Sequence, residues 1–384
     1  MAQRKRIGFL FSYDEGWIGG TYYVLNIIEA LNILEDKKKP AITILSSKKE
    51  DFELVATETQ YPHLKFELFP RKLTLVENIV NKASRFFTKK NVFHFTSKLK
   101  DVEFIYPNYN PKIKNPNIKK VYWIPDFQEE FLPEYFTKNE IESRKNHQRM
   151  ISDSGDVVVF SSKDAASHYN SMYPVSKPNQ FVLPFAVTHP DFSKLNTNEI
   201  LRKHKLPEKY FFTPNQFWAH KNHLTIIKAL NQLKLEGLDV VVAFSGKEYD
   251  NRTTDSVSEI KSYIKNNNLE NNVLFLGFLD RKEQLLIQKN AIAVVQPSLF
   301  EGWSTVVEDS KSLNKFIILS DLNVHYEQVN ENCAFFEKTN EKQLAELLKK
   351  YYISPPEEVT NSTYNLKIKE FAENFIKLIE GTVK

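Results

Sequence analysis

Short apolar runs alternate with helix-patterned segments along most of this chain, and that alternation constrains its fold more than any other feature. Strands that are apolar on both faces are typical of parallel sheets covered by helices on both sides. A first series of such runs covers Ile7–Phe11, Ala41–Leu45, Val102–Tyr106, Val121–Ile124, Val157–Phe160 and Gln180–Leu183. A second series covers Tyr210–Thr213, Val240–Ser245, Val273–Leu276, Ala291–Gln296 and Phe316–Leu319. The sequence therefore predicts an α/β protein of two Rossmann-like, doubly wound domains that face each other across a cleft.

The length of 384 residues is enough for two hydrophobic cores. We predict a first domain over residues 1–190 and a second over 191–361, with the break in the polar stretch Thr188–Lys205. Residues 362–384 should form a C-terminal helix, amphipathic over Ser362–Leu378, that could cross back to the first domain. Helical spacing of apolar residues also predicts Tyr22–Leu34, Leu224–Leu235, Ser256–Asn268 and Arg281–Lys289 as connecting helices.

Composition excludes several classes of protein. The net charge of +4 is small for a nucleic-acid-binding protein, so no nucleic-acid partner is expected. No apolar run reaches about 18 residues, the length that a membrane-spanning helix needs. The single cysteine, Cys333, excludes an internal disulfide and favours a reducing cytoplasm. The chain has no G-x-G sequence, so the fingerprints of dinucleotide oxidoreductases and P-loop proteins are missing.

The strongest functional signal is the segment Pro297–Lys315, which directly follows the predicted strand ending at Gln296. Thr305 followed by Glu308 matches a capping box and predicts a helix start, and Asn314 is a typical left-handed terminator. A helix N-terminus at the carboxyl edge of a parallel sheet attracts anions. Carboxylates in the same segment can accept hydrogen bonds from ribose or sugar hydroxyls.

This segment closely resembles the donor-binding motif of family 4 glycosyltransferases, which have the GT-B fold of two Rossmann-like domains. In that family two acidic residues with seven residues between them frame the nucleotide-sugar, and here that spacing joins Glu301 to Asp309. Glu308 comes one residue early, so either Asp309 or Glu308 takes the ribose role, and the capping box favours Asp309. The resemblance extends the expected donor contacts to the residues that follow Glu301: Gly302, Trp303, Ser304 and Thr305.

The loop Pro214–His223 resembles the diphosphate loop of the same family, in which an Arg and a Lys five residues apart hold the donor phosphates. Lys221 falls on the Lys position, and Gln216 stands where Arg is usual. An ammonium on a phosphate is a charge-assisted contact that contributes roughly 1.5–3 kcal/mol. The histidines His220 and His223 could suggest metal ligands, but no further residue completes such a site.

Weaker matches complete the expected donor site. Gly19 and Gly20 lie in the loop Tyr13–Tyr22, where they would let the backbone approach a ligand, although an ordinary tight turn also explains them. Asp126 follows a predicted strand and could contact a sugar hydroxyl or the acceptor, or could cap a turn. Three further residues close predicted strands near the expected nucleotide: Gly246, Gly277 and Phe278.

The stretch Arg71–Lys100 is unusually basic, with eight Lys or Arg residues against one acid, Glu77, and therefore a local charge of +7. Four phenylalanines are interleaved with these charges: Phe86, Phe87, Phe93 and Phe95. Such a stretch can lie on an anionic membrane, and it could also be a solvated helix face or bind RNA. We favour peripheral contact with an anionic membrane through residues 71–100.

Together these features imply a hexosyltransferase-type enzyme that moves a sugar from a nucleotide-sugar donor to a glycan or lipid-linked acceptor. The family implies retention of configuration and a role in surface polysaccharide or glycoconjugate biosynthesis, in the cytoplasm or at the inner face of the membrane. Lys221, Glu301 and Asp126 are the expected catalytic residues, and neither metal nor cofactor is expected, since no D-x-D pair occurs. Two alternatives stay open: a nucleotide-sugar epimerase on the same fold, and a non-catalytic nucleotide-binding relative.

Overall fold

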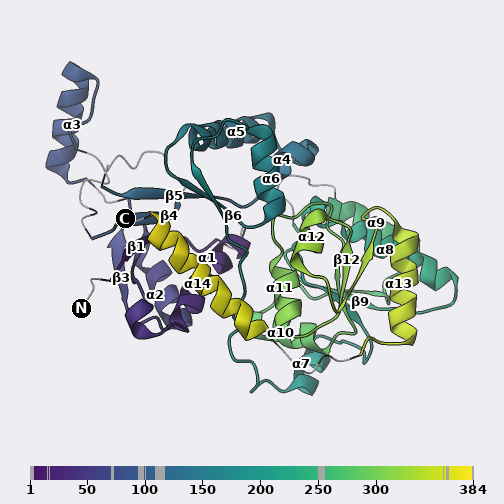
Figure 1. Ribbon diagram of the computed structural model, residues 1–384. Coiled ribbons are helices and arrows are strands. Elements are labelled where there is room, and N and C mark those ends of the chain that lie inside the picture. The colour runs from purple at the N-terminus through teal and green to yellow at the C-terminus, as the bar shows by residue number, and fades with distance from the viewer. Residues whose placement is uncertain are drawn as a thin grey trace.

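The computed structural model describes residues 4–382 apart from 15, 17, 71–72, 94–98, 100, 109–116, 250–255, 358 and 360–362. Two α/β domains lie side by side, each built around a parallel sheet with helices packed against it (Figure 1). The fold class predicted from the alternation of apolar runs and helices is therefore confirmed.

The described part of the first domain contains a seven-stranded parallel sheet in the order β3-β2-β1-β4-β5-β6-β7. The order reverses between β1 and β4, so the loops after these strands diverge at the carboxyl edge and leave a crevice. The strands are β1 (Arg6–Leu10), β2 (Ala41–Ser46), β3 (Leu64–Leu68), β4 (Phe104–Asn108), β5 (Lys119–Ile124), β6 (Val157–Phe160) and β7 (Asn179–Val182). The helices are α1 (Ile18–Asn32), α2 (Lys49–Thr59), α3 (Leu75–Thr88), α4 (Gln128–Phe131), α5 (Lys138–Asp153) and α6 (Lys163–Met172), with short 3-10 turns at Asp36–Lys38 and Pro133–Tyr135.

The second domain repeats this architecture with six parallel strands among its described residues, in the order β10-β9-β8-β11-β12-β13. Its order reverses between β8 and β11, which places the loops Pro214–His223 and Pro297–Ser304 on either side of the crevice. The strands are β8 (Phe211–Thr213), β9 (Val242–Phe244), β10 (Val273–Phe275), β11 (Val294–Gln296), β12 (Ile317–Ser320) and β13 (Cys333–Phe336). The helices are α7 (Thr197–Lys203), α8 (His223–Leu235), α9 (Ser256–Asn266), α10 (Arg281–Asn290), α11 (Thr305–Ser312), α12 (Asn323–Gln328) and α13 (Glu341–Ile353), with a 3-10 turn at Ala219–Lys221.

The last helix, α14 (Tyr364–Thr382), returns from the second domain to the first (Figure 1). Its apolar face includes Phe371, Phe375 and Ile379, which are buried in the same core cluster as α1 and the first sheet. Phe375 stacks on Phe9 of β1 with ring centroids 5.8 Å apart. The chain therefore crosses between the domains twice, once after β7 and once before α14.

The structure differs from the sequence expectation at several elements. The edge strands β3 and β13 were not predicted: β3 mixes polar with apolar residues, and β13 is a run of only four apolar residues. Helix α1 begins at Ile18 rather than at Tyr22, so Gly19 and Gly20 lie in its first turn and not in a loop. An added Cβ at Gly19 would meet nothing within 4 Å, which indicates open space beside that turn.

Candidate active site

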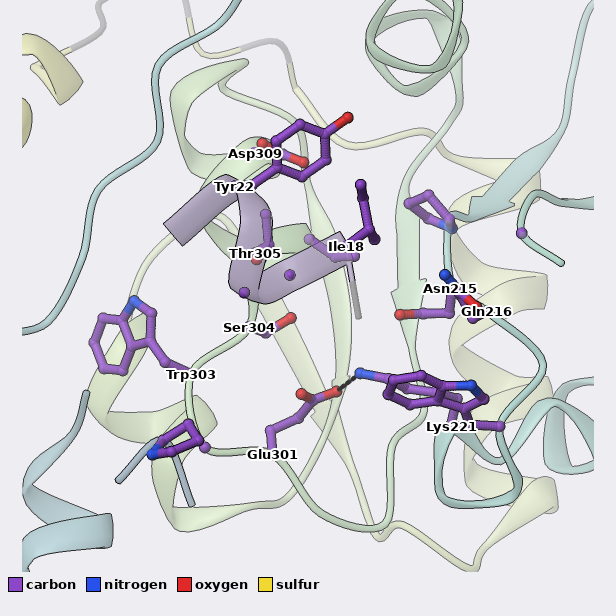
Figure 2. Close-up of a pocket in the computed structure, with 18 of the residues that line it drawn as sticks. Ile18, Tyr22, Asn215, Gln216, Lys221, Glu301, Trp303, Ser304, Thr305 and Asp309 are labelled. Carbon is purple, nitrogen blue, oxygen red and sulfur yellow. Dashed lines mark hydrogen bonds and ion pairs between the residues drawn. The ribbon is translucent and has the colours of Figure 1, made fainter. Parts of the chain in front are cut away.

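A pocket lies between the two domains, at the crevices formed by their loop edges (Figure 2). The first domain contributes the start of α1 and the residues after β5, and the second contributes the loops after β8 and β11. The residues singled out from the sequence that line this pocket are Gly19, Gly20, Asp126, Gln216, Lys221, Gly246, Phe278, Glu301, Gly302, Trp303, Ser304, Thr305 and Asp309. Gly277 and Glu308 are not among the lining residues.

Lys221 and Glu301 form an ion pair across the crevice of the second domain, with Nζ 2.5 Å from Oε1 (Figure 2). The Glu301 carboxylate also accepts hydrogen bonds from Ser298 Oγ at 2.7 Å and from Gln296 Nε2 at 2.8 Å. Burial alone would raise the pKa of Glu301, but the Lys221 ammonium and these hydrogen bonds outweigh it and the pKa is lowered. Glu301 therefore stays ionised and can accept hydrogen bonds from hydroxyls.

Two glycines are required by close backbone approaches at this pocket. A Cβ on Gly302 would lie 2.3 Å from the carbonyl oxygen of Pro125 and 2.8 Å from Cβ of Asp126, so the loops of the two domains touch there. A Cβ on Gly246, whose φ is +143°, would lie 2.4 Å from the carbonyl oxygen of Asn215. Larger side chains at either position would push the pocket walls apart.

Helix α11 begins beside Glu301, but its cap differs from the sequence prediction. Ser304, not Thr305, is the N-cap, and its Oγ accepts a hydrogen bond from the N–H of Val307 at 3.4 Å. The expected capping box is therefore wrong, because the third residue of the helix is Val307 and Glu308 points elsewhere. Asn314 does adopt the left-handed conformation predicted for it, with φ of 53°.

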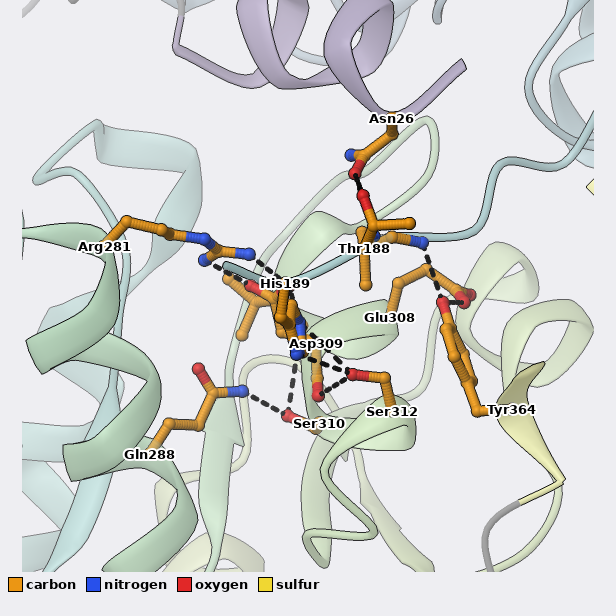
Figure 3. Close-up of polar contacts among 12 residues, drawn as sticks. Asn26, Thr188, His189, Arg281, Gln288, Glu308, Asp309, Ser310, Ser312 and Tyr364 are labelled. Carbon is orange, nitrogen blue, oxygen red and sulfur yellow. Dashed lines mark hydrogen bonds and ion pairs between the residues drawn. The ribbon is translucent and has the colours of Figure 1, made fainter. Parts of the chain in front are cut away.

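Glu308, on α11, has a buried side chain, and three neighbouring side chains hold its carboxylate (Figure 3). Lys311 Nζ lies 2.7 Å from Oε1, and Gln328 Nε2 donates to the same oxygen at 2.9 Å. The hydroxyl of Tyr364, the first residue of α14, donates to Oε2. Glu308 thus ties α11 to α12 and α14, away from the pocket.

Asp309 lies in the pocket wall and is 1% exposed (Figure 3). Arg281 makes a bidentate pair with it, with N–O distances of 2.7 and 2.5 Å, and His189 Nε2 lies 3.0 Å from Oδ1. Burial alone would raise the pKa of Asp309, but Arg281 and His189 lower it to about 2. No sequence motif pointed to Arg281 or to His189, because each meets Asp309 only through the fold.

Asp126 lies on the first-domain side of the pocket, where it makes a turn contact. Its Oδ1 accepts a hydrogen bond from the backbone N–H of Gln128 at 3.1 Å, as expected for an Asp that caps a turn. Burial raises the pKa of Asp126, and the negative charge of Glu301 adds to this effect, whereas Arg144 opposes it. The contact with Gln128 agrees with the capping role, and contact of Asp126 with a sugar hydroxyl or the acceptor stays a prediction.

Trp303 connects the pocket to the first domain. Its indole N–H donates to the carbonyl oxygen of Phe185 at 3.0 Å, and its ring packs against the first-domain core. Other pocket residues that sequence reasoning missed come from both domains: Tyr22, Trp123, Gln128, Ser161, Asn215, Trp218 and Gln284. Among the described residues, no group of three or more His, Cys, Asp or Glu side chains is placed to hold a metal ion.

Comparison with known proteins matches residues 196–368 to the family described as glycosyl transferases group 1. A curated relative, the O-antigen chain mannosyltransferase RfbU of Salmonella typhimurium, is 23% identical over 158 residues, which span 41% of this chain and 42% of that protein. The match thus covers less than half the length of this relative.

Solved structures with a similar fold cover nearly the whole chain. A glycosyltransferase from Rickettsia africae is 16% identical with a TM-score of 0.63, covering 99% of this chain and 94% of its own. Anabaena HepE, in complex with UDP and glucose, is 14% identical with a TM-score of 0.63, covering 99% of this chain and 96% of its own. The second domain is therefore similar to the glycosyl transferases group 1 family, and the two domains together have the GT-B fold.

Proposed function

We propose that this protein is a glycosyltransferase that moves a hexosyl group from a nucleotide-sugar, bound between the domains, to a glycan or lipid-linked acceptor. The observation that carries the proposal is the Lys221–Glu301 pair beside the start of α11, in the pocket at the domain boundary. A cation and a helix N-terminus suit the donor diphosphate, and an ionised carboxylate suits sugar hydroxyls.

The proposed reaction breaks the bond between the anomeric carbon of the sugar and the β-phosphate oxygen of the donor. A bond forms between that carbon and an acceptor hydroxyl oxygen, and the nucleoside diphosphate leaves with increased negative charge. The proton of the acceptor hydroxyl passes to the departing diphosphate or to solvent. Lys221 and the first N–H groups of α11 would stabilise this developing charge, the step at which fixed positive groups accelerate a reaction most. Asp126, opposite Glu301 in the pocket, would contact the transferred sugar or the acceptor.

Retention of configuration and a role in surface polysaccharide or glycoconjugate biosynthesis are part of this proposal. The family resemblance supports retention, and the named activity of the Salmonella typhimurium relative supports the biosynthetic role. Product analysis by NMR tests retention. The one-bond C–H coupling constant at the new anomeric carbon distinguishes the α from the β configuration, and retention means that product and donor have the same one.

A panel of nucleotide-sugars tests donor binding. A bound donor raises the melting temperature by mass action, so one class of nucleotide should stabilise the protein clearly above the rest. Incubation with that donor alone then separates the alternatives. An epimerase would convert the donor without acceptor, and a non-catalytic relative would bind it without turnover under any condition.

We also propose that α3 docks the first domain on an anionic membrane. None of the described helices is long and apolar enough to cross a membrane. Helix α3 projects away from both domain cores (Figure 1), and Leu75, Phe86 and Phe87 are each more than 80% exposed. The exposed basic side chains on and directly after the helix are Lys82, Arg85, Lys89 and Lys90.

An exposed apolar face beside basic residues is the pattern of a helix that lies at a membrane surface. It argues against the alternative in which the phenylalanines of this stretch face a protein core, because Phe86 and Phe87 are 83% and 81% exposed. Phe93 is part-buried, and the other basic and phenylalanine residues of the stretch lie outside the described residues: Arg71, Lys72, Phe95, Lys98 and Lys100. A surface position of the enzyme would suit a lipid-linked acceptor.

A further inference from the structure

The charged residues around the pocket leave the donor diphosphate short of positive charge. Among the described lining residues, Lys221 and Arg281 are the Lys and Arg side chains, while Asp126, Glu301 and Asp309 are carboxylates. The family that the loop Pro214–His223 resembles usually has an arginine at position 216, but a neutral glutamine stands there. A nucleoside diphosphate carries about two to three negative charges, so a second cation in addition to Lys221 and the start of α11 would strengthen its binding.

Arg281 lines the same pocket as Lys221 and is held in place by several contacts. It is the first residue of α10, whose N-cap Asp280 accepts hydrogen bonds from the N–H groups of Lys282 and Glu283. The guanidinium carbon lies 5.1 Å from the centre of the Tyr22 ring, across the domain boundary. The side chain is 15% exposed.

The pairing with Asp309 orients this guanidinium without using all of its donors. The two bonds to the carboxylate take two of the five N–H groups that an arginine carries. His189 in turn holds Asp309 from the linker between the domains, and Ser312 lies 3.2 Å from the His189 ring nitrogens. Asp309 is therefore fixed from two sides, and its bidentate pairing fixes the Arg281 guanidinium in turn (Figure 3).

We infer that Arg281 is a second donor-binding cation, which supplies to the diphosphate the positive charge that Gln216 does not. Asp309 then acts mainly through Arg281, as a positioning residue. This inference rests on the proposed function, since it concerns how the same pocket holds a nucleotide donor. The structural support is the position of Arg281 in the pocket lining together with its bidentate anchor.

Calorimetric titration with nucleoside diphosphates and the matching nucleosides tests the inference. UDP and GDP are the charged probes, and uridine and guanosine are the same molecules without phosphate. Arg281→Gln should weaken binding of the diphosphate about ten-fold or more, the loss expected for one charge-assisted contact, and should change nucleoside binding little. Lys282→Gln is the matched control, because it removes an exposed charge from the same turn of α10 outside the pocket.

Two further variants keep the test decisive if Arg281→Gln is unstable. The double variant Arg281→Gln with Asp309→Asn removes both partners, so no buried charge is left unpaired, and should show the same selective loss of diphosphate affinity. Asp309→Asn alone should also weaken the diphosphate more than the nucleoside, whereas a direct ribose contact by Asp309 would weaken both equally.

The outcomes separate this inference from the proposed function. Diphosphate affinity unchanged in Arg281→Gln, but lost in Lys221→Gln, would overturn the inference and leave the proposed function standing. Equal weakening of diphosphate and nucleoside by Arg281→Gln would also overturn it, because the residue would then support the base or ribose. A wild-type protein that binds no nucleoside diphosphate would instead refute the proposed function.

Discussion

The Lys221–Glu301 pair is largely buried. Removal of one charge would therefore leave the other without a counter-ion and with little access to water. The side chains are 15% and 9% exposed, and three hydrogen-bonding groups converge on the carboxylate. The Lys221 ammonium lowers the pKa of Glu301, and the pair holds both side chains in place. An incoming donor can then offer its diphosphate to the ammonium and a hydroxyl to the carboxylate.

Lys221→Ala should lower kcat/KM at least ten-fold, because it removes a charge-assisted contact that contributes about 1.5–3 kcal/mol as the diphosphate leaves. Steady-state kinetics with the donor that the nucleotide-sugar panel identifies measures the effect, and Lys282→Gln serves as the control for loss of a surface charge. Near-normal kcat/KM in a folded Lys221→Ala protein would rule out a role for Lys221 in stabilising the departing diphosphate.

Glu308→Gln should destabilise the protein by on the order of 1–3 kcal/mol while leaving nucleotide binding nearly unchanged. The reason is that Glu308 joins Lys311, Gln328 and Tyr364 behind the pocket rather than in it. Urea unfolding measures the first effect and calorimetry the second. If Glu308→Gln weakened nucleotide binding more than Asp309→Asn does, the ribose role would pass to Glu308.

Glu29, on the face of α1 near Arg281, should make stability depend on pH. Burial raises its pKa from 4.5 to about 7, and the charge of Glu58 adds to this, so ionised Glu29 opposes folding. The penalty is complete above pH 7, shrinks as pH falls through the folded-state pKa and vanishes below the unfolded value of 4.5. Glu29→Gln should therefore stabilise the protein by up to about 3 kcal/mol at pH 8.

Unfolding in urea at pH 8 and pH 5 measures this dependence on pH. The advantage of Glu29→Gln over wild type should be clearly smaller at pH 5. Glu53→Gln is a suitable control, because Glu53 is exposed on α2 of the same domain. An advantage that is equal at both pH values would mean that Glu29 does not titrate in this range.

At the scale of elements, strands with apolar residues on both faces were predictable, because burial in a parallel sheet imposes that composition. The edge strands β3 and β13 were not, since β3 alternates apolar with charged residues and β13 is an apolar run of only four residues. The start of α11 was predicted within one residue, but its cap was misassigned because Ser304 and Thr305 are both good caps.

The residues of the candidate site also divide into those that the sequence could predict and those that it could not. Residues on the loops after β8 and β11 could be found from the sequence, because a parallel sheet brings the carboxyl ends of its strands together. Arg281 and His189 could not, since they reach Asp309 from 28 and 120 residues away and neither belongs to a local motif. The role of Glu308 was also hidden, because its partner Tyr364 is 56 residues further along the chain.

Helix α3 should bind anionic vesicles through its basic side chains and its exposed phenylalanines. Co-sedimentation should show binding to phosphatidylglycerol vesicles at low salt, and weaker binding at 1 M salt, where the Debye length falls to about 3 Å. Replacing Lys82, Arg85 and Lys89 by Gln should weaken this binding strongly, since each basic residue contributes ~1 kcal/mol at such a surface.

A matched control replaces three exposed lysines of α13, Lys342, Lys349 and Lys350, by Gln. That variant loses the same charge from the second domain and should bind vesicles like wild type. Equal binding to neutral phosphatidylcholine vesicles, or no binding to anionic ones at low salt, would rule out electrostatic docking through α3.

At the scale of the whole molecule, several contacts hold the domains together around the pocket. The Glu327 carboxylate of α12 accepts hydrogen bonds from the N–H groups of Lys163 and Asp164 at the start of α6, at 2.8 and 3.1 Å. A carboxylate at a helix N-terminus is favourable, so this contact favours the arrangement in which both crevices face each other. Helix α14 and Trp303 reinforce it from the other side.

The proposed charge stabilisation by Lys221 and α11 predicts transfer that needs no divalent metal. Activity should survive an excess of EDTA with little change in rate. Complete loss with EDTA, and recovery on adding Mg²⁺ or Mn²⁺, would mean that a metal ion carries the charge assigned to these protein groups.

The most direct test of the proposed function measures release of nucleoside diphosphate. The substrate is the nucleotide-sugar that raises the melting temperature of the protein, and the reaction is run with and without a mixture of glycan and lipid-linked acceptors. We predict release that depends on acceptor, that yields a new glycosidic bond detectable by mass spectrometry, and that falls at least ten-fold in Lys221→Ala and Glu301→Gln. Release that is equal in wild type and both variants, or conversion of the donor to an epimer without acceptor, would contradict the account.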